Sequence, residues 1–208
     1  MTTYRAAWVP DDDSGLTFDE LEAPAVEWIE QMSAEAGVAP ILVVNAVQSA
    51  AGPGIVAEFG RRYGYTTPRT KDHPASGVPV LAFRPTLEAF DYAQQLARGS
   101  ALCVIEGMSF PLAMWAAEVG AINLLNPDAP VPVLDPKLEE DLDSIHFFGG
   151  NNGWSGPHER DHARQFLQTW RDQGELDADL ICGYMQAKGV HARGIKRLRK
   201  IIDTMNDN

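Results

Sequence analysis

The chain has 208 residues, of which 45% are hydrophobic and 22% are charged, and its formal net charge is −12. A chain of this length buries roughly 70% of its unfolded surface, enough for one sizeable core and a smaller extension. No apolar stretch approaches the roughly 20 residues that cross a bilayer, and the start of the chain lacks a secretory signal. We therefore predict a soluble, cytoplasmic protein, in which Cys103 and Cys182 are packed thiols rather than a disulfide.

Positive charge is concentrated near the end of the chain. The segment from Met185 to Lys200 carries six cations and no acid, so it has a charge of +6 and leaves −18 for the remainder. An acidic body repels phosphate, and only this segment offers a local basic face. A general nucleic-acid surface is therefore not expected, whereas contact of the basic segment with protein is expected.

Short apolar runs alternate with helical patterns through the first two thirds of the chain. Continuous runs at Pro40–Val44, Val78–Phe83 and Ala101–Ile105 are typical of strands that are buried on both faces. We predict that these three are adjacent parallel strands, with further strands at Tyr4–Val9 and Ala121–Leu125. The pattern predicts an α/β fold with a Rossmann-like, open and mostly parallel sheet.

Helix start and stop signals separate these strands. Thr17 and Glu20 have the spacing of a capping box, and Gly37 marks the end of the helix, which Pro24 could divide. Gly120 should end a later helix. The helices of this region are predicted at 17–36, 55–63, 87–98 and 110–119.

The alternation ends at a proline-rich connector, residues 126–136, and only helical patterns follow it. We expect these helices at 137–145, 159–173, 177–188 and 192–204. The chain is thus predicted to contain an α/β domain, residues 1–136, and a helical extension, residues 137–208, packed on it. The polar segment 64–77 is predicted to be a surface loop.

Polar residues follow the predicted strands, and ligands of open parallel sheets bind outside the carboxyl ends of the strands. A carboxylate there is partly desolvated and suits an acid or base, and a guanidinium suits an anion, so Glu106 and Arg84 are the candidate catalytic residues. Alternatively, Glu106 and Arg84 have structural roles, for example as an ion pair with each other. Four further polar residues could orient a ligand: Asn45, Gln48, Thr86 and Ser109. The turn 49–54 lacks the residues of the known phosphate-binding loops.

The segment from His146 to Trp154 joins aromatic residues to glycines and asparagines. Glycine and asparagine tolerate a positive φ, so Asn151, Asn152 and Trp154 could face a ligand. The alternative is a tight loop in which Phe147, Phe148 and Trp154 pack against the sheet.

His158-Glu159-Arg160-Asp161-His162 matches the H-E-x-x-H pattern of zinc hydrolases. A third ligand could be Glu175 or Asp179. Two charged residues inside the motif and its place in the first helical turn argue against zinc, because the helix dipole disfavours positive charge there. We predict no metal site.

These patterns support three functional hypotheses. The first is that the protein binds or transforms a small polar ligand, nucleotide-like ligands included, at the carboxyl ends of the strands. The alternative is a non-enzymatic interaction module that uses the basic C-terminal helix and the Trp154 loop to contact a protein partner or a second copy. Zinc hydrolysis is the third. No cofactor, membrane contact or nucleic-acid partner is indicated.

Overall fold

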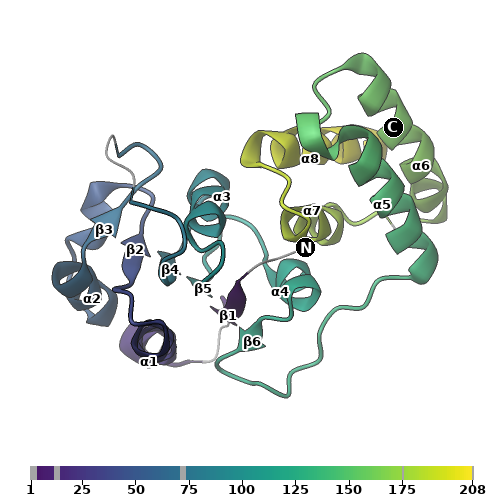
Figure 1. Ribbon diagram of the computed structural model, residues 1–208. Helices are drawn as coiled ribbons and strands as arrows, with labels where there is room; N and C mark the ends of the chain where they lie inside the picture. Colours follow the sequence, from purple (N-terminus) through teal and green to yellow (C-terminus); the bar gives the residue numbers. More distant parts are fainter. Residues whose placement is uncertain (1–3, 12–14, 71–73, 175, 208) are drawn as a thin grey trace. The chain divides into compact units, whose positions relative to one another are not determined.

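The computed structural model describes residues 4–11, 15–70, 74–174 and 176–207 (Figure 1). The chain forms two compact units. Unit 1 comprises Met1–Leu112 and Val119–Pro130, and unit 2 comprises Ala113–Glu118 and Val131–Asn208. The chain thus enters unit 2 for a short helix, returns to unit 1 and enters unit 2 again after residue 130. Among the described residues, no helix is both long and apolar enough to cross a membrane.

Unit 1 contains a six-stranded sheet in the order β3-β2-β4-β5-β1-β6, and all of its pairings are parallel. This confirms the predicted α/β, Rossmann-like fold with helices at the C-terminal end of the chain. The strands are β1 (Arg5–Val9), β2 (Ile41–Val43), β3 (Tyr65–Thr66), β4 (Val80–Phe83), β5 (Ala101–Ile105) and β6 (Ile122–Asn123).

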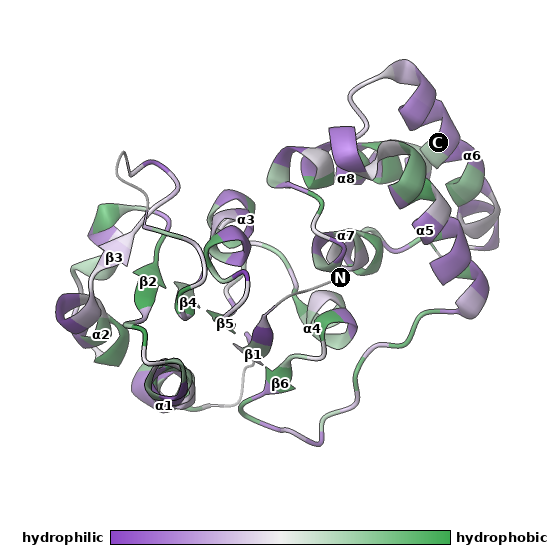
Figure 2. Ribbon diagram, in the orientation of Figure 1, coloured by the Kyte–Doolittle hydropathy of each residue, from purple (hydrophilic) through white to green (hydrophobic). Residues whose placement is uncertain are grey.

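The strands β2, β4 and β5 are neighbours inside the sheet, and their adjacent, parallel pairing confirms the prediction. Leu42 lies opposite Leu81, which in turn lies opposite Cys103, and all three side chains are fully buried. Strands covered on both faces need apolar residues at every position, which explains the continuous runs in the sequence. In Figure 2, β2 and β4 are coloured hydrophobic.

The strand order places a topological switch between β2 and β4. The chain leaves β2 toward β3 at one edge of the sheet, whereas it leaves β4 toward β5 in the opposite direction. The loops that follow these two strands therefore diverge and leave a crevice at the carboxyl ends of the strands, where open α/β sheets bind ligands.

The helices of unit 1 are α1 (Phe18–Ala36), α2 (Ile55–Tyr63) and α3 (Leu87–Leu96), with a 3-10 turn, η1 (Val47–Ala50). Figure 1 shows α1 and α3 on opposite faces of the sheet. Thr17 and Glu20 form the predicted capping box of α1, and Gly37 ends it in a left-handed conformation. Pro24 lies inside α1 without dividing it. Ala25 and Ile29 of α1 are fully buried in the core between this helix and the sheet.

The structure differs from the predicted elements at the edges of the sheet. β3 lies within the segment 64–77 that was predicted to be a loop, and two residues are too few to produce a periodic pattern. β6 is likewise limited to Ile122 and Asn123, because it pairs with β1 over two residues only. Short edge strands leave few unpaired backbone groups.

Unit 2 is helical. Its helices are α4 (Ala113–Val119), α5 (Pro136–Gly149), α6 (Pro157–Gln173), α7 (Ala178–Ala187) and α8 (Ala192–Asn206), with a 3-10 turn, η2 (Gly150–Asn152). Apolar side chains of several helices are fully buried within the unit, among them Leu142, Leu167 and Leu198. In Figure 2, α6 is largely hydrophilic, in keeping with a helix that buries only a narrow stripe.

Candidate functional site

Arg84 directly follows β4 and has a φ of +42°, a conformation that is uncommon for a residue with a side chain. Its backbone N–H donates to the carbonyl of Ile105 at 2.8 Å, which ties it to the end of β5. The side-chain amide of Asn45, which lies beyond β2, donates to the Arg84 carbonyl at 2.8 Å and accepts from the Thr86 N–H at 2.6 Å. Three strand ends thus hold Arg84 in a backbone conformation that costs about 1–3 kcal/mol.

The Arg84 side chain lies between two aromatic rings. Its guanidinium carbon is 4.7 Å from the ring centroid of Phe18 and 5.2 Å from that of Phe83. One guanidinium nitrogen, Nη2, is 3.5 Å from Oε1 of Glu22. The side chain passes over Gly107, where an added Cβ would lie 2.9 Å from the Cβ of Arg84. Arg84 is nevertheless 39% exposed, so part of its side chain can be reached by a ligand.

Glu22 projects from α1 toward Arg84 and is only 7% exposed. Burial raises the pKa of Glu22, because a carboxylate loses hydration there, while the positive charge of Arg84 opposes the rise. A glutamate that is buried in this way needs a charged partner, and 3.5 Å is longer than an ordinary charge-assisted hydrogen bond. The charge of Glu22 is therefore only partly compensated by Arg84.

Two cavities meet at Arg84. The larger one has a volume of about 740 Å³ and is lined by apolar side chains, Arg84 and the polar residues Asp11 and Ser109. The smaller one has a volume of about 220 Å³ and is lined by Glu22, Asp19 and the turn before α2. Phe18 and Arg84 line both cavities, so we call the two together the strand-end crevice.

Glu106 does not pair with Arg84 in this structure. Its Oε1 accepts the Leu112 N–H at 2.9 Å, and its Oε2 accepts the Asp11 N–H at 3.4 Å. Burial raises the pKa of Glu106, although these two N–H groups oppose the rise. Glu106 thus holds the loops that follow β1 and β5, which is the structural alternative that the sequence left open. Its role as an acid or base stays a prediction.

The other predicted ligand-binding residues at the strand ends differ in their surroundings. Ser109 lines the larger cavity. Thr86 caps α3 by accepting from the Ala89 N–H at 3.4 Å. Both polar atoms of Asn45 are used by the turn after β4, and Gln48 lies exposed in η1. The structure therefore brings Arg84 and Ser109 to one cavity and gives Asn45 and Thr86 structural partners.

The glycine-asparagine segment of unit 2 is a packing corner. Trp154 is fully buried, and an added Cβ at Gly149 would lie 2.3 Å from its indole ring. An added Cβ at Gly150 would meet the ring of His146 at 2.4 Å. Close packing thus accounts for these two glycines. Asn151 is exposed at this corner.

The prediction that Phe147 and Phe148 pack against the sheet is wrong. Phe147 is 78% exposed and Phe148 is 56% exposed, and their rings form an edge-to-face pair with centroids 5.2 Å apart. The reason is that α5 extends to Gly149, so both residues stand on a helix that buries a different set of positions, Leu138, Leu142, Ile145 and Gly149.

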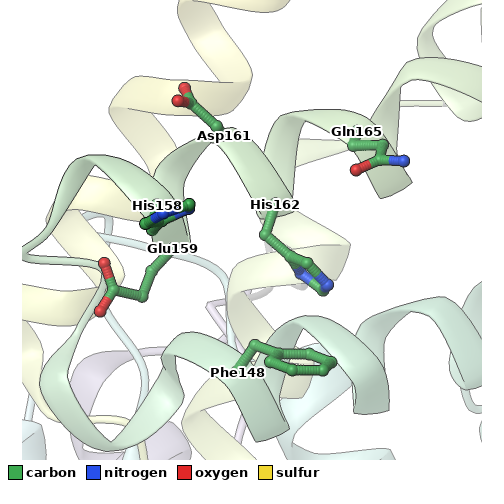
Figure 3. Close-up of a pocket in the computed structure, with 6 residues that line it drawn as sticks. All are labelled: Phe148, His158, Glu159, Asp161, His162 and Gln165. Carbon is green, nitrogen blue, oxygen red and sulfur yellow. The ribbon is translucent and has the colours of Figure 1, made fainter.

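The H-E-x-x-H stretch begins α6 and lines a cavity of about 470 Å³ together with Phe148. Figure 3 shows His162 directed toward the ring of Phe148, with centroids 4.2 Å apart, and Asp161 pointing away. Glu159 accepts a hydrogen bond from Asn152 at 2.8 Å.

Among the described residues, no group of three histidine, cysteine, aspartate or glutamate side chains is placed to hold a metal ion. Of the two third ligands considered, Asp179 pairs with Arg199, and Glu175 lies outside the described residues. The geometry of the motif therefore gives no support to zinc hydrolysis.

Sequence reasoning missed Glu22 and Phe18. Both lie on α1, whose pattern indicates only an amphipathic helix with a capping box. They meet Arg84 across about 60 positions of the chain, and no local spacing reports such a contact. The sequence offers one signal, which is Phe18. It is a large apolar residue at the start of a helix, a position where contact with solvent would favour a polar residue.

Comparisons of the chain with protein-family models, with curated proteins and with solved structures found no match.

Proposed function

We propose that unit 1 binds a small organic anion in the strand-end crevice, with the Arg84 guanidinium as its anchor. The observation that carries this proposal is the strained backbone of Arg84, which three strand ends hold in place while its side chain stays 39% exposed between two cavities. Backbone strain of this kind persists only where the surrounding structure holds the residue in place, and it is concentrated at ligand sites.

The chemistry of the crevice favours a ligand with one anionic group and an apolar part. A guanidinium binds carboxylate or phosphate through two parallel N–H donors, and among the described residues Arg84 is the only arginine or lysine that lines either cavity. The larger cavity offers Leu16, Phe18 and Met108, which are 45%, 68% and 97% exposed. A bound apolar group would remove these side chains from water. Glu106, which binds two loops, is not required for this function.

Ligand titration of the full chain tests the proposal. The probes are 3-phenylpropionate, L-phenylalanine, AMP and inorganic phosphate, followed by thermal shift and by calorimetry. We expect at least one organic anion to bind, and Arg84→Gln to weaken its binding at least tenfold. Arg62→Gln, which removes the same charge from an exposed position on α2, should bind as the wild type does. Absence of binding by every probe, or equal affinity in Arg84→Gln, would refute the proposal.

A second candidate function rests on the exposed Phe147–Phe148 pair of unit 2. Contiguous exposed apolar surface is a feature of interaction sites, and these two rings contact each other edge to face. Glu139 and Glu140 line a cavity beside the pair, and the basic segment of the same chain presents exposed cations such as Arg193. We propose that a second copy of the chain covers this surface, since it supplies the complementary charge.

The oligomeric state tests this second function. Light scattering after size exclusion should show a dimer in the wild type and a monomer in Phe147→Ser/Phe148→Ser. Val38→Ser, which changes another exposed apolar residue, should leave the dimer intact. A wild-type protein that stays monomeric at high concentration would exclude the proposal.

A further inference from the structure

Glu22 is a buried carboxylate with incomplete compensation. Its side chain is 7% exposed, and among the described residues its one hydrogen-bond or ion-pair partner is Arg84, at 3.5 Å through a single nitrogen. Charge-assisted pairs between nitrogen and carboxylate oxygen are ordinarily about 2.7–2.9 Å long. Burial of a charge is costly unless pairing is good, so Glu22 can accept a further cationic donor.

Because Glu22 lines the strand-end crevice, a further cationic donor would reach it from there. Glu22 lines the smaller cavity, and a second carboxylate, that of Asp19, lines it as well. Asp19 also accepts the Ile55 N–H at the start of α2, at 3.4 Å. A group that enters this cavity therefore meets two carboxylates and one guanidinium. An ammonium group would be attracted by both carboxylates.

From this charge arrangement we infer that the ligand of the strand-end crevice is a zwitterion, an amino acid or related amino compound with an apolar side chain. The inference rests on the proposed function. The carboxylate of the ligand lies at Arg84 and its ammonium group at Glu22. Each of these two side chains thus gains a further partner of opposite charge. Its apolar side chain lies in the larger cavity against Phe18 and Met108. The smaller cavity, of about 220 Å³, holds only the charged end.

The same charges disfavour a polyphosphate. Asp11, Asp19 and Glu22 line the crevice, and within the part of the chain that the structure describes Arg84 is the only arginine or lysine that does so. A ligand with several negative charges would meet more like charges than opposite ones at short range. A neutral or purely cationic ligand would leave the guanidinium of Arg84 unused. A zwitterion satisfies both signs.

Three matched compounds separate these ligand classes. L-phenylalanine carries both charges, 3-phenylpropionate lacks the ammonium group, and phenethylamine lacks the carboxylate. Titration of the full-length wild type should show that L-phenylalanine binds at least tenfold more tightly than either of the others. Glu22→Gln should remove this preference, weakening L-phenylalanine at least tenfold while 3-phenylpropionate binds as well as before or better.

Glu30→Gln is the control, because Glu30 lies on the same helix and pairs with Arg62 away from the crevice. It should keep the preference for L-phenylalanine. If Glu22→Gln fails to fold, Asp19→Asn provides a second test, with a smaller loss of the same preference expected. Equal affinities of L-phenylalanine and 3-phenylpropionate would overturn the inference and leave the proposed function standing. Absence of binding by all three compounds would overturn the inference, and the proposed function with it if AMP and inorganic phosphate also fail to bind.

Discussion

Gly107 determines how closely the Arg84 side chain can approach the end of β5. An added Cβ at Gly107 would lie 2.9 Å from the Cβ of Arg84 and 3.2 Å from its Cγ, closer than such atoms pack. Gly107→Ala should therefore destabilise the protein by about 1–3 kcal/mol, since Arg84 has to move. Urea unfolding measures this loss. Gly52→Ala, at a position with nothing within 4 Å, should change the stability by less than about 0.5 kcal/mol. Equal stabilities of the two variants would contradict the prediction.

Glu106 should make the stability depend on pH. Because burial raises its pKa above the ordinary value of 4.5, the folded state holds its proton at a pH where the unfolded state has lost it. The stabilisation is complete below the unfolded pKa and is lost as pH rises through the folded pKa. Glu106→Gln cannot lose a proton. Its unfolding free energy relative to the wild type should therefore increase as pH rises upward from about 4.

Urea titrations of both proteins between about pH 4 and pH 7 measure this difference. Glu58→Gln is the control, at an exposed position on α2. Its stability relative to the wild type should stay constant over the same interval. A constant difference for Glu106→Gln would show that the hydrogen bonds from Leu112 and Asp11 cancel the effect of burial, and a difference that decreases with pH would show that they outweigh it.

At the scale of elements, the capping box of α1 positions Phe18 and Glu22 for the crevice. Glu20 accepts the Thr17 N–H at 2.8 Å, and Thr17 accepts the Glu20 N–H at 3.4 Å. Thr17→Ala should destabilise the protein by about 0.5–2 kcal/mol, measured by urea unfolding. Thr169→Ala, at an exposed position within α6, should have no such cost. A Thr17→Ala protein as stable as the wild type would mean that packing alone maintains the start of α1.

The fold could be predicted from the sequence because its central strands are buried on both faces. Such burial requires continuous apolar runs, and those runs mark β2, β4 and β5 in the sequence. β3 was not predicted, because two paired residues produce no pattern, and the strand predicted at Ala121–Leu125 is limited to Ile122–Asn123. The candidate site could be predicted only in part. Arg84 and Ser109 follow strands, whereas Glu22 reaches the crevice through the packing of α1 on the sheet, which no local spacing reports.

At the scale of the whole molecule, the chain passes between the two units more than once. α4 belongs to unit 2 although β5 and β6, which precede and follow it, belong to unit 1. Gly183 of α7 approaches α4 closely, since an added Cβ there would lie 2.8 Å from the Cβ of Met114. A chain that ended after residue 130 would leave α4 without α7, so the two units are not separable at the connector.

The basic segment is a further feature of the whole molecule, because it is attached to a remainder with a charge of −18. Within unit 2, Arg197 donates to the Gly153 carbonyl at 3.0 Å, and Arg199 pairs with Asp179. These contacts favour a structural role over binding of nucleic acid.

The triple substitution Lys196→Ala, Arg197→Ala and Lys200→Ala should therefore lower the unfolding free energy by about 0.5–1.5 kcal/mol, through loss of the hydrogen bond to Gly153. Its affinity for duplex DNA, measured by anisotropy, should stay as weak as that of the wild type. Tight wild-type binding, with a salt dependence that becomes shallower in the variant, would show that these cations contact phosphates.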